Sequence, residues 1–134
     1  MDAARLDGIP LFEALSAEER EQLAERLKQV SFAAGQRLMS QDQFGVAAYV
    51  VADGQAEVVR DGQHLADLGA GDVVGEMALF GGWEEPRNAT VVASTAVTAI
   101  RISDSEFRHI LRELPEVAAK LRAAAQGRSA SGPA

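Results

Sequence analysis

The sequence predicts an α+β domain, an antiparallel β-roll (a jelly roll, or double-stranded β-helix) with α-helices before and after it. Apolar residues recur at helical spacing near both ends of the chain. Between these ends, glycines divide the chain into short β-rich runs about every seven to ten residues. With 134 residues, the chain is long enough for one domain with a single hydrophobic core.

The predicted helical segment before the roll covers residues 9–30, and its main helix runs from Ser16 to about Val30. Ser16 and Glu19 have the spacing of a capping box, in which each side chain bonds to the other residue's backbone N–H. Leu27 and Val30 continue the helical spacing of apolar residues toward the end of this segment.

The predicted β-roll covers residues 31–103. Asp53-Gly54 and Asp61-Gly62 are typical of two-residue hairpin turns, whose positions need the positive φ that aspartate and glycine tolerate. They flank residues 55–60, a predicted strand. Residues 41–46 are predicted to form a loop without ligand contacts.

Two helices over residues 104–126 are predicted to follow the roll. Ser103 and Glu106 have the capping-box spacing at the start of the first helix. The apolar residues of this helix that would face inward are Phe107, Ile110 and Leu111.

The second of these helices is predicted to begin at Pro115, which suits a first helical turn, and to end at Gly127. Residues 127–134 are small and polar, so we expect a disordered tail. The folded domain would then cover residues 1–126.

Composition excludes several classes of function. A net charge of −7 argues against direct nucleic-acid binding, which needs a basic face to neutralise phosphates. No run approaches the roughly 18 apolar residues of a membrane span, and the first residues lack a signal-peptide pattern. The chain has no cysteine, and we expect a cytoplasmic location. His64 and His109 are too scattered for a metal site, and no serine has a nucleophile context, so we expect no enzyme activity.

The most informative motif is Gly75-Glu76-Met77-Ala78-Leu79, followed by Arg87-Asn88-Ala89-Thr90. Gly75 lets the backbone approach a ligand closely, and the amides of a following helical turn would point outward as anion donors. Arg87 adds a permanent positive charge suited to bidentate contact with a phosphate. Glu76 would repel that phosphate but can accept from neutral hydroxyls. The motif therefore predicts a site for a sugar phosphate or nucleotide.

Residues 71–79 and 86–90 together resemble the phosphate-binding cassette of cyclic nucleotide-binding domains. This family includes catabolite activator proteins, regulatory subunits of cyclic-AMP-dependent kinase and gated ion channels. The resemblance extends to the N-terminal helical segment at residues 9–16, the turn at residues 32–36 and the strand at residues 49–54. It implies a β-roll flanked by helices.

The resemblance also implies a set of ligand-binding residues. They are Gly75, Glu76, Met77, Ala78, Arg87, Asn88, Ala89 and Thr90. The backbone amides around Gly75 and directly after Arg87 would bind the cyclic phosphate. The Arg87 side chain would form an ion pair with the same phosphate, and Glu76 would bind the ribose hydroxyl. Thr90 is equally consistent with an ordinary strand residue.

The implied function is that of a regulatory sensor without a cofactor, which binds cyclic AMP or cyclic GMP and repositions its C-terminal helices. Cyclic AMP is the more expected ligand, but Asn88 stands where relatives commonly have alanine, serine or threonine, which leaves the preference open. No output segment follows Gly127, so the chain would act on a protein partner or be a fragment of a longer protein with a fused effector. The alternative is a ligand-free interaction or dimerisation module.

Overall fold

The computed structural model describes residues 1–44, 47–76, 79, 87 and 89–131. Within these residues, short 3-10 helices precede a helix, eight strands and two further helices. In chain order the elements are η1 (Ala3–Leu6), η2 (Pro10–Phe12), α1 (Ala17–Arg26), β1 (Lys28–Phe32), β2 (Arg37–Met39), β3 (Ala48–Asp53), β4 (Ala56–Arg60), β5 (Gln63–Leu68), β6 (Val73–Val74), β7 (Thr90–Ala93), β8 (Val97–Ile102), α2 (Asp104–Glu113) and α3 (Pro115–Ser131).

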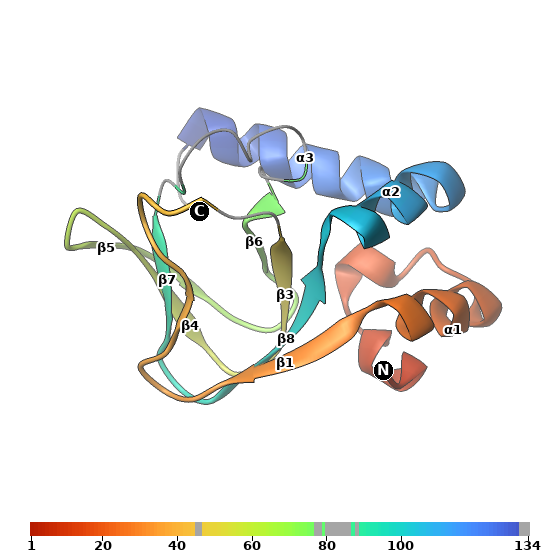
Figure 1. Ribbon diagram of the computed structural model, residues 1–134, viewed down its shortest axis with the longest axis horizontal. Coiled ribbons are helices and arrows are strands. Elements are labelled where there is room, and N and C mark those ends of the chain that lie inside the picture. Colours follow the sequence, from red (N-terminus) through yellow and green to blue (C-terminus); the bar gives the residue numbers. More distant parts are fainter. Residues whose placement is uncertain (45–46, 77–78, 80–86, 88, 132–134) are drawn as a thin grey trace.

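The strands form two antiparallel four-stranded sheets, in the orders β1-β8-β3-β6 and β2-β7-β4-β5 (Figure 1). Successive residues of a strand point to opposite faces of its sheet. On β3, Val50 belongs to the core beneath the helices, whereas Val51 belongs to the core between the sheets. Ile100 and Ala99 on β8 divide in the same way. This architecture confirms the predicted α+β fold, a β-roll with helices at both ends of the chain.

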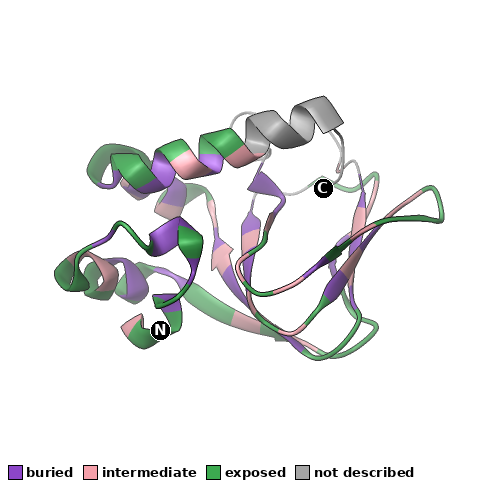
Figure 2. Ribbon diagram, turned by 180° about the vertical axis from the view of Figure 1, so that it is seen from behind, coloured by how far each residue is buried: buried purple, intermediate pink, exposed green. Residues whose placement is uncertain are grey.

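The helices before and after the roll share one hydrophobic core on the outer face of the first sheet. Phe12 and Leu23 enter this core from the N-terminal segment, and Ile110 and Leu121 enter it from α2 and α3. All four side chains are fully buried. Figure 2 shows buried positions in α1, α2 and the start of α3 as well as in the strands. Burying each such side chain stabilises the fold by about 1.5–3 kcal/mol. Because both ends of the chain contribute side chains to this core, it holds the helices before and after the roll together.

Two of the predicted local signals are confirmed in detail. The Ser16 hydroxyl accepts a hydrogen bond from the Glu19 amide at 3.1 Å, and the Ser16 amide donates to the Glu19 carboxylate at 2.9 Å. Asp61 and Gly62, with φ of 52° and 79°, form the turn between the paired strands β4 and β5. Positive φ at both positions is the geometry of a tight hairpin turn.

The predicted continuation of the first helix to Val30 is wrong. Helix α1 ends at Arg26, and β1 begins at Lys28, with Val30 opposite Ala99 of β8. Residues 29–32 alternate between polar and apolar side chains as well as extending the helical spacing, and pairing with β8 decides between the two patterns. The β-roll therefore begins at residue 28 and not at residue 31.

The hairpin predicted at Asp53-Gly54 is also wrong. Strands β3 and β4 belong to different sheets, so this glycine lies where the chain crosses from one sheet to the other. A Cβ atom on Gly54 would lie 2.1 Å from the carbonyl oxygen of Ala96, and its φ is +92°. The glycine is needed for this close backbone approach, which the dipeptide pattern alone does not distinguish from a hairpin.

Helix α2 begins after Ser103 as predicted, but its cap differs from a capping box. The Ser103 hydroxyl donates to the Glu106 carboxylate and makes no side-chain bond to the helix backbone. Phe107 and Ile110 are buried as predicted, whereas Leu111 is 43% exposed, which contradicts its predicted inward position. Phe107, Ile110 and Leu114 already form the buried stripe, and Leu111 lies at the edge of that stripe.

Helix α3 begins at Pro115 as predicted but continues past Gly127 to Ser131. Gly127 is therefore not the helix stop, and residues 127–131, predicted to be a disordered tail, belong to the helix. A glycine inside a helix costs only about 1 kcal/mol relative to alanine, which is too little to end a helix on its own. None of the helices in the described ranges is long and apolar enough to span a membrane.

Candidate functional site

The candidate site begins where β6 ends. Val74 pairs with Tyr49 of β3, and the next residue, Gly75, is buried with a φ of +76°. Glu76 and Leu79 have 3-10 helical conformation. The left-handed glycine and the helical conformation at Glu76 agree with the local structure that the sequence predicts here, and residues 77–78 of the predicted turn lie outside the described residues.

The backbone of Arg87 is held by the loop after β2. The Arg87 amide donates to the carbonyl of Gln43 at 2.7 Å, and the Arg87 carbonyl accepts from the amide of Asp42 at 2.9 Å. We predicted that the loop at residues 41–46 would lie apart from ligand contacts. Its described part holds the backbone of the principal candidate residue through these two hydrogen bonds, a support that short-range sequence patterns do not reveal.

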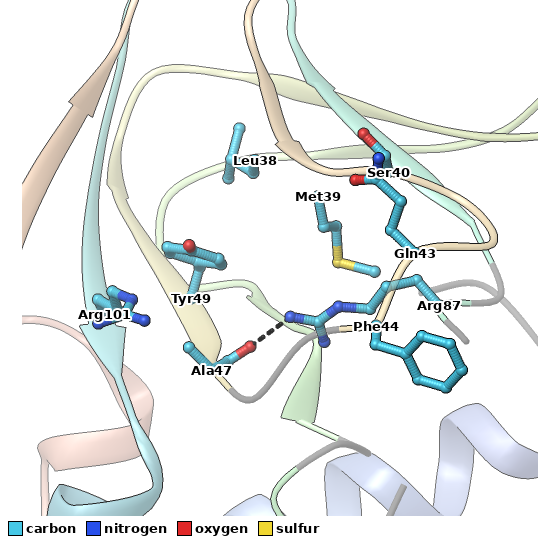
Figure 3. Close-up of a pocket in the computed structure, with 9 residues that line it drawn as sticks. All are labelled: Leu38, Met39, Ser40, Gln43, Phe44, Ala47, Tyr49, Arg87 and Arg101. Atoms are coloured by element: carbon cyan, nitrogen blue, oxygen red, sulfur yellow. Dashed lines mark hydrogen bonds between the residues drawn. The ribbon is translucent and has the colours of Figure 1, made fainter. Parts of the chain in front are cut away.

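The guanidinium of Arg87 connects the two halves of the motif. Its Nη1 donates to the carbonyl of Gly75 at 3.2 Å, and its Nη2 donates to the carbonyl of Ala47 at 2.7 Å (Figure 3). Burial lowers the pKa of Arg87, while Tyr49 and Glu76 act in the opposite direction. The side chain remains charged near neutral pH because an arginine starts from so high a value.

Glu76 is the one charged side chain that is fully buried among the residues that the structure describes. It interacts electrostatically with Arg87. A buried carboxylate is expensive to keep ionised without a compensating charge, and a partly buried arginine beside it supplies that charge. Ionisable side chains of opposite charge that are buried next to each other, like Glu76 and Arg87, are common at ligand-binding sites.

The structure describes only some of the remaining predicted site residues. Ala89 is fully buried in the core between the sheets, directly after the motif's arginine. The hydroxyl of Thr90 accepts from the amide of Gln41 at 2.9 Å, so Thr90 has a structural partner on β7. The predicted ligand contacts of Met77, Ala78 and Asn88 fall outside the described residues.

The two histidines lie apart, on β5 and α2. His64 is near the carboxylates of Glu57 and Asp67, at 3.4 Å and 3.6 Å, on the surface of the β4–β5 hairpin. No group of three or more metal-ligating side chains is arranged to hold a metal ion in the described part of the chain.

Comparison with known proteins agrees with this geometry. A family model described as the cyclic nucleotide-binding domain matches residues 29–113. A cAMP-dependent protein kinase regulatory subunit from Schizosaccharomyces pombe is 34% identical over 107 residues, which is 79% of this chain and 26% of the relative. A cyclic nucleotide-gated potassium channel from Rhizobium etli is 30% identical over 93% of this chain and 34% of its own length. The chain thus spans about a quarter to a third of these relatives.

Solved structures give the same result. The Thermus thermophilus catabolite activator protein matches 91% of this chain and 59% of its own, at 31% identity and a TM-score of 0.79. The N-terminal domain of a transcriptional regulator from Streptomyces coelicolor A3(2) matches 98% and 94%, at 31% identity and a TM-score of 0.69. A regulatory subunit of a cAMP-independent protein kinase A from Trypanosoma brucei matches 92% and 44%, at 28% identity and a TM-score of 0.77. The chain belongs to the cyclic nucleotide-binding domain family.

Proposed function

We propose that this domain reversibly binds a cyclic nucleotide, with cyclic AMP preferred over cyclic GMP, and signals by moving its C-terminal helices. Arg87 would pair with the cyclic phosphate, and Glu76 would accept a hydrogen bond from the ribose hydroxyl. The backbone amides around Gly75, including those of Met77 and Ala78, and the amides after Arg87 would complete the anion site.

The observation that carries this proposal is the contact between Arg87 and Gly75 beside the buried Glu76. An arginine that already donates to two carbonyls has further N–H donors in its guanidinium plane, which fit the oxygens of a phosphate. A carboxylate next to it suits a neutral hydroxyl and not a second anion. A ligand with a phosphate and a sugar hydroxyl side by side matches both groups.

The preference for cyclic AMP rests on relatives. Several kinase regulatory subunits that resemble this chain are named for their dependence on cAMP. The Trypanosoma brucei kinase subunit, of comparable similarity, is described as cAMP-independent, so family membership alone does not fix the ligand. The preference must therefore be tested directly.

The proposed signal passes through Leu79. This residue follows the candidate phosphate-binding turn and is buried in the core that the helices form against the first sheet. Phe107, Ile110 and Leu121 belong to the same core. A ligand that tightens the turn around Gly75 would shift Leu79 against these side chains and bias the position of α2 and α3. The simplest mechanism of regulation is one in which the ligand shifts the equilibrium between two positions of these helices.

The output of such a movement is proposed to be a protein partner or a fused effector. The relatives in which this domain occurs are longer than the aligned region, and the domain covers 26% of the fission yeast kinase subunit and 59% of the activator protein. The signal would be read from the surface of α2 and α3.

Isothermal titration calorimetry with cyclic AMP, cyclic GMP and 5′-AMP tests the proposal. We expect saturable binding of one cyclic nucleotide per chain, tighter for cyclic AMP than for cyclic GMP, and much weaker binding of the open 5′-AMP. Binding of neither cyclic nucleotide would contradict the proposal and would favour a ligand-free interaction module. Tighter binding of cyclic GMP would reverse only the stated preference.

A further inference from the structure

A pocket lies on the β2–β3 side of Arg87. It has a volume of about 270 Å³ and is lined in part by residues of the loop after β2 (Figure 3). Of the described residues of the nucleotide-binding motif, only Arg87 lines it. The lining residues that the structure describes are Leu38, Met39, Ser40, Gln43, Phe44, Ala47, Tyr49, Arg87 and Arg101.

The side chain of Arg101 enters this pocket from β8. Arg101 pairs with Tyr49 across the β3–β8 ladder, so their side chains lie on the same face of the sheet, toward the interior of the roll. Arg101 is partly buried. Within the described residues, no carboxylate lies within ion-pair distance of it and no hydrogen bond from its guanidinium is present.

The charge of the pocket is unusual for this protein. Two guanidinium groups, those of Arg87 and Arg101, line the same space, and none of the described lining residues is acidic. The chain as a whole carries a net charge of −7, so carboxylates are abundant elsewhere. Glu76 compensates the charge of Arg87 from outside the pocket, whereas no described acidic side chain lines the pocket beside Arg101. An anion in the pocket would therefore offset the charge of this second, partly buried cation.

The other lining groups indicate the size and chemistry of the anion. Ser40, Gln43 and Tyr49 carry hydroxyl or amide donors, and Leu38 and Met39 form a buried apolar wall. Phe44 is 68% exposed at the edge. Small-molecule sites usually measure roughly 300–1,000 Å³, so this pocket is at the lower limit and suits a small ligand better than a nucleotide.

We propose that this pocket is a second anion site, which binds inorganic phosphate or a small phosphomonoester between Arg101 and Arg87. Arginine is suited to this ligand because its planar fork bonds two phosphate oxygens at once. The proposal shares Arg87 with the function proposed for the motif, whereas Arg101 lies outside the predicted cyclic nucleotide contacts and is specific to this site.

The test is a titration of the ¹⁵N-labelled protein with inorganic phosphate, followed by NMR, with sodium chloride adjusted to hold ionic strength constant. We expect saturable amide shifts at Tyr49, Arg87 and Arg101. In Arg101→Gln, phosphate binding should weaken by roughly ten- to a hundredfold, the effect of losing a charged hydrogen-bond partner. Arg101→Lys keeps the charge and should bind between the wild type and Arg101→Gln.

The matched control is Arg37→Gln, which removes an exposed arginine of β2 that does not line the pocket. It should bind phosphate as the wild type does. Absence of saturable shifts in the wild type, unchanged phosphate binding in Arg101→Gln, or an equal loss in Arg37→Gln would each overturn the proposal. Cyclic nucleotide binding by Arg101→Gln, measured in parallel, should stay near that of the wild type, which separates failure of this site from failure of the proposed function.

Discussion

The guanidinium of Arg87 lies directly against the α-carbon of Gly75. Nη1 donates to the Gly75 carbonyl at 3.2 Å, and a Cβ atom added to Gly75 would lie 2.8 Å from that same nitrogen. The added atom would also lie 3.1 Å from the carbonyl oxygen of Ala47, which accepts from Nη2. The observed position of the Arg87 guanidinium, twelve residues further along the chain, therefore requires a glycine at position 75.

Gly75→Ala is expected to displace the Arg87 side chain and to weaken nucleotide binding by at least about tenfold. The left-handed φ of +76° costs an alanine about 1–2 kcal/mol, and the contact with Nη1 adds to that cost. Thermal unfolding and calorimetry with cyclic AMP measure the two effects.

Gly62→Ala is the matched control for this substitution. Gly62 has a similar φ of +79°, but nothing lies within 4 Å of an added Cβ. It should lose similar backbone stability and keep nucleotide binding. Equal binding by the Gly75 and Gly62 variants would show that the contact with Arg87 is not needed for the ligand.

Glu76 is expected to act through the sugar of the ligand. Losing a charged hydrogen bond from the ribose hydroxyl costs about 1.5–3 kcal/mol, whether the acceptor is removed by Glu76→Ala or the donor is removed by changing the ligand to 2′-deoxy cyclic AMP. Because both changes remove the same bond, the two losses in binding free energy should not add in a double-mutant cycle measured by calorimetry. Additive losses would assign Glu76 a purely structural role.

The start of helix α2 should be sensitive to acid. Burial raises the pKa of Glu106, but hydrogen bonds from the hydroxyls of Ser103 and Ser105 and from the backbone outweigh this and lower it below its ordinary value. A lowered carboxyl pKa gives stability that is present above the unfolded-state pKa and is lost as pH falls through the folded-state pKa.

Glu106→Gln should therefore cost about 1 kcal/mol of unfolding free energy at pH 7, and this difference from the wild type should shrink as pH falls below the ordinary glutamate pKa. Urea unfolding of both proteins at pH 7 and near pH 3 measures the difference. A cost that does not change with pH would mean that the charge of Glu106 does not stabilise the helix start.

The contact of Lys120 with the N-terminal segment should restrain α3. Its Nζ donates to the carbonyl of Pro10 at 2.6 Å and to the carboxylate of Glu13 at 3.1 Å. Lys120→Met should increase hydrogen exchange in α3 in the ligand-free protein, with Lys28→Met, an exposed lysine on β1, as the control.

In the wild type, binding of a cyclic nucleotide should slow hydrogen exchange both around Gly75 and over residues 104–126. Slower exchange around Gly75 alone would show that the ligand is bound but that its effect is not transmitted to the helices.

The sequence predicted those features whose cause is local. The Ser16–Glu19 capping box, the Asp61-Gly62 turn and the start of α3 at Pro115 each depend on residues within a few positions. Gly75, directly after β6, could also be identified from the sequence, because a short motif contains it together with Glu76 and Arg87.

The sequence did not predict features that depend on distant partners. Strand β1 replaces the end of the first helix because β8 offers it a partner about seventy residues away. The crossing at Gly54 depends on Ala96, and the support of Arg87 by Gln43 depends on a loop more than forty residues earlier. Such long-range contacts cannot be predicted from the residues next to them in the sequence.

The most direct measurement is the calorimetric titration of cyclic AMP into the wild type and Arg87→Gln, with Arg37→Gln as a charge-matched control. If Arg87 pairs with the cyclic phosphate, its loss should cost about 2–5 kcal/mol, or roughly thirty- to several-thousandfold in Kd, and the control should bind as the wild type does. Thermal unfolding should show a smaller loss of stability, because Arg87 also holds the carbonyls of Gly75 and Ala47. Wild-type affinity in a folded Arg87→Gln protein would contradict the account.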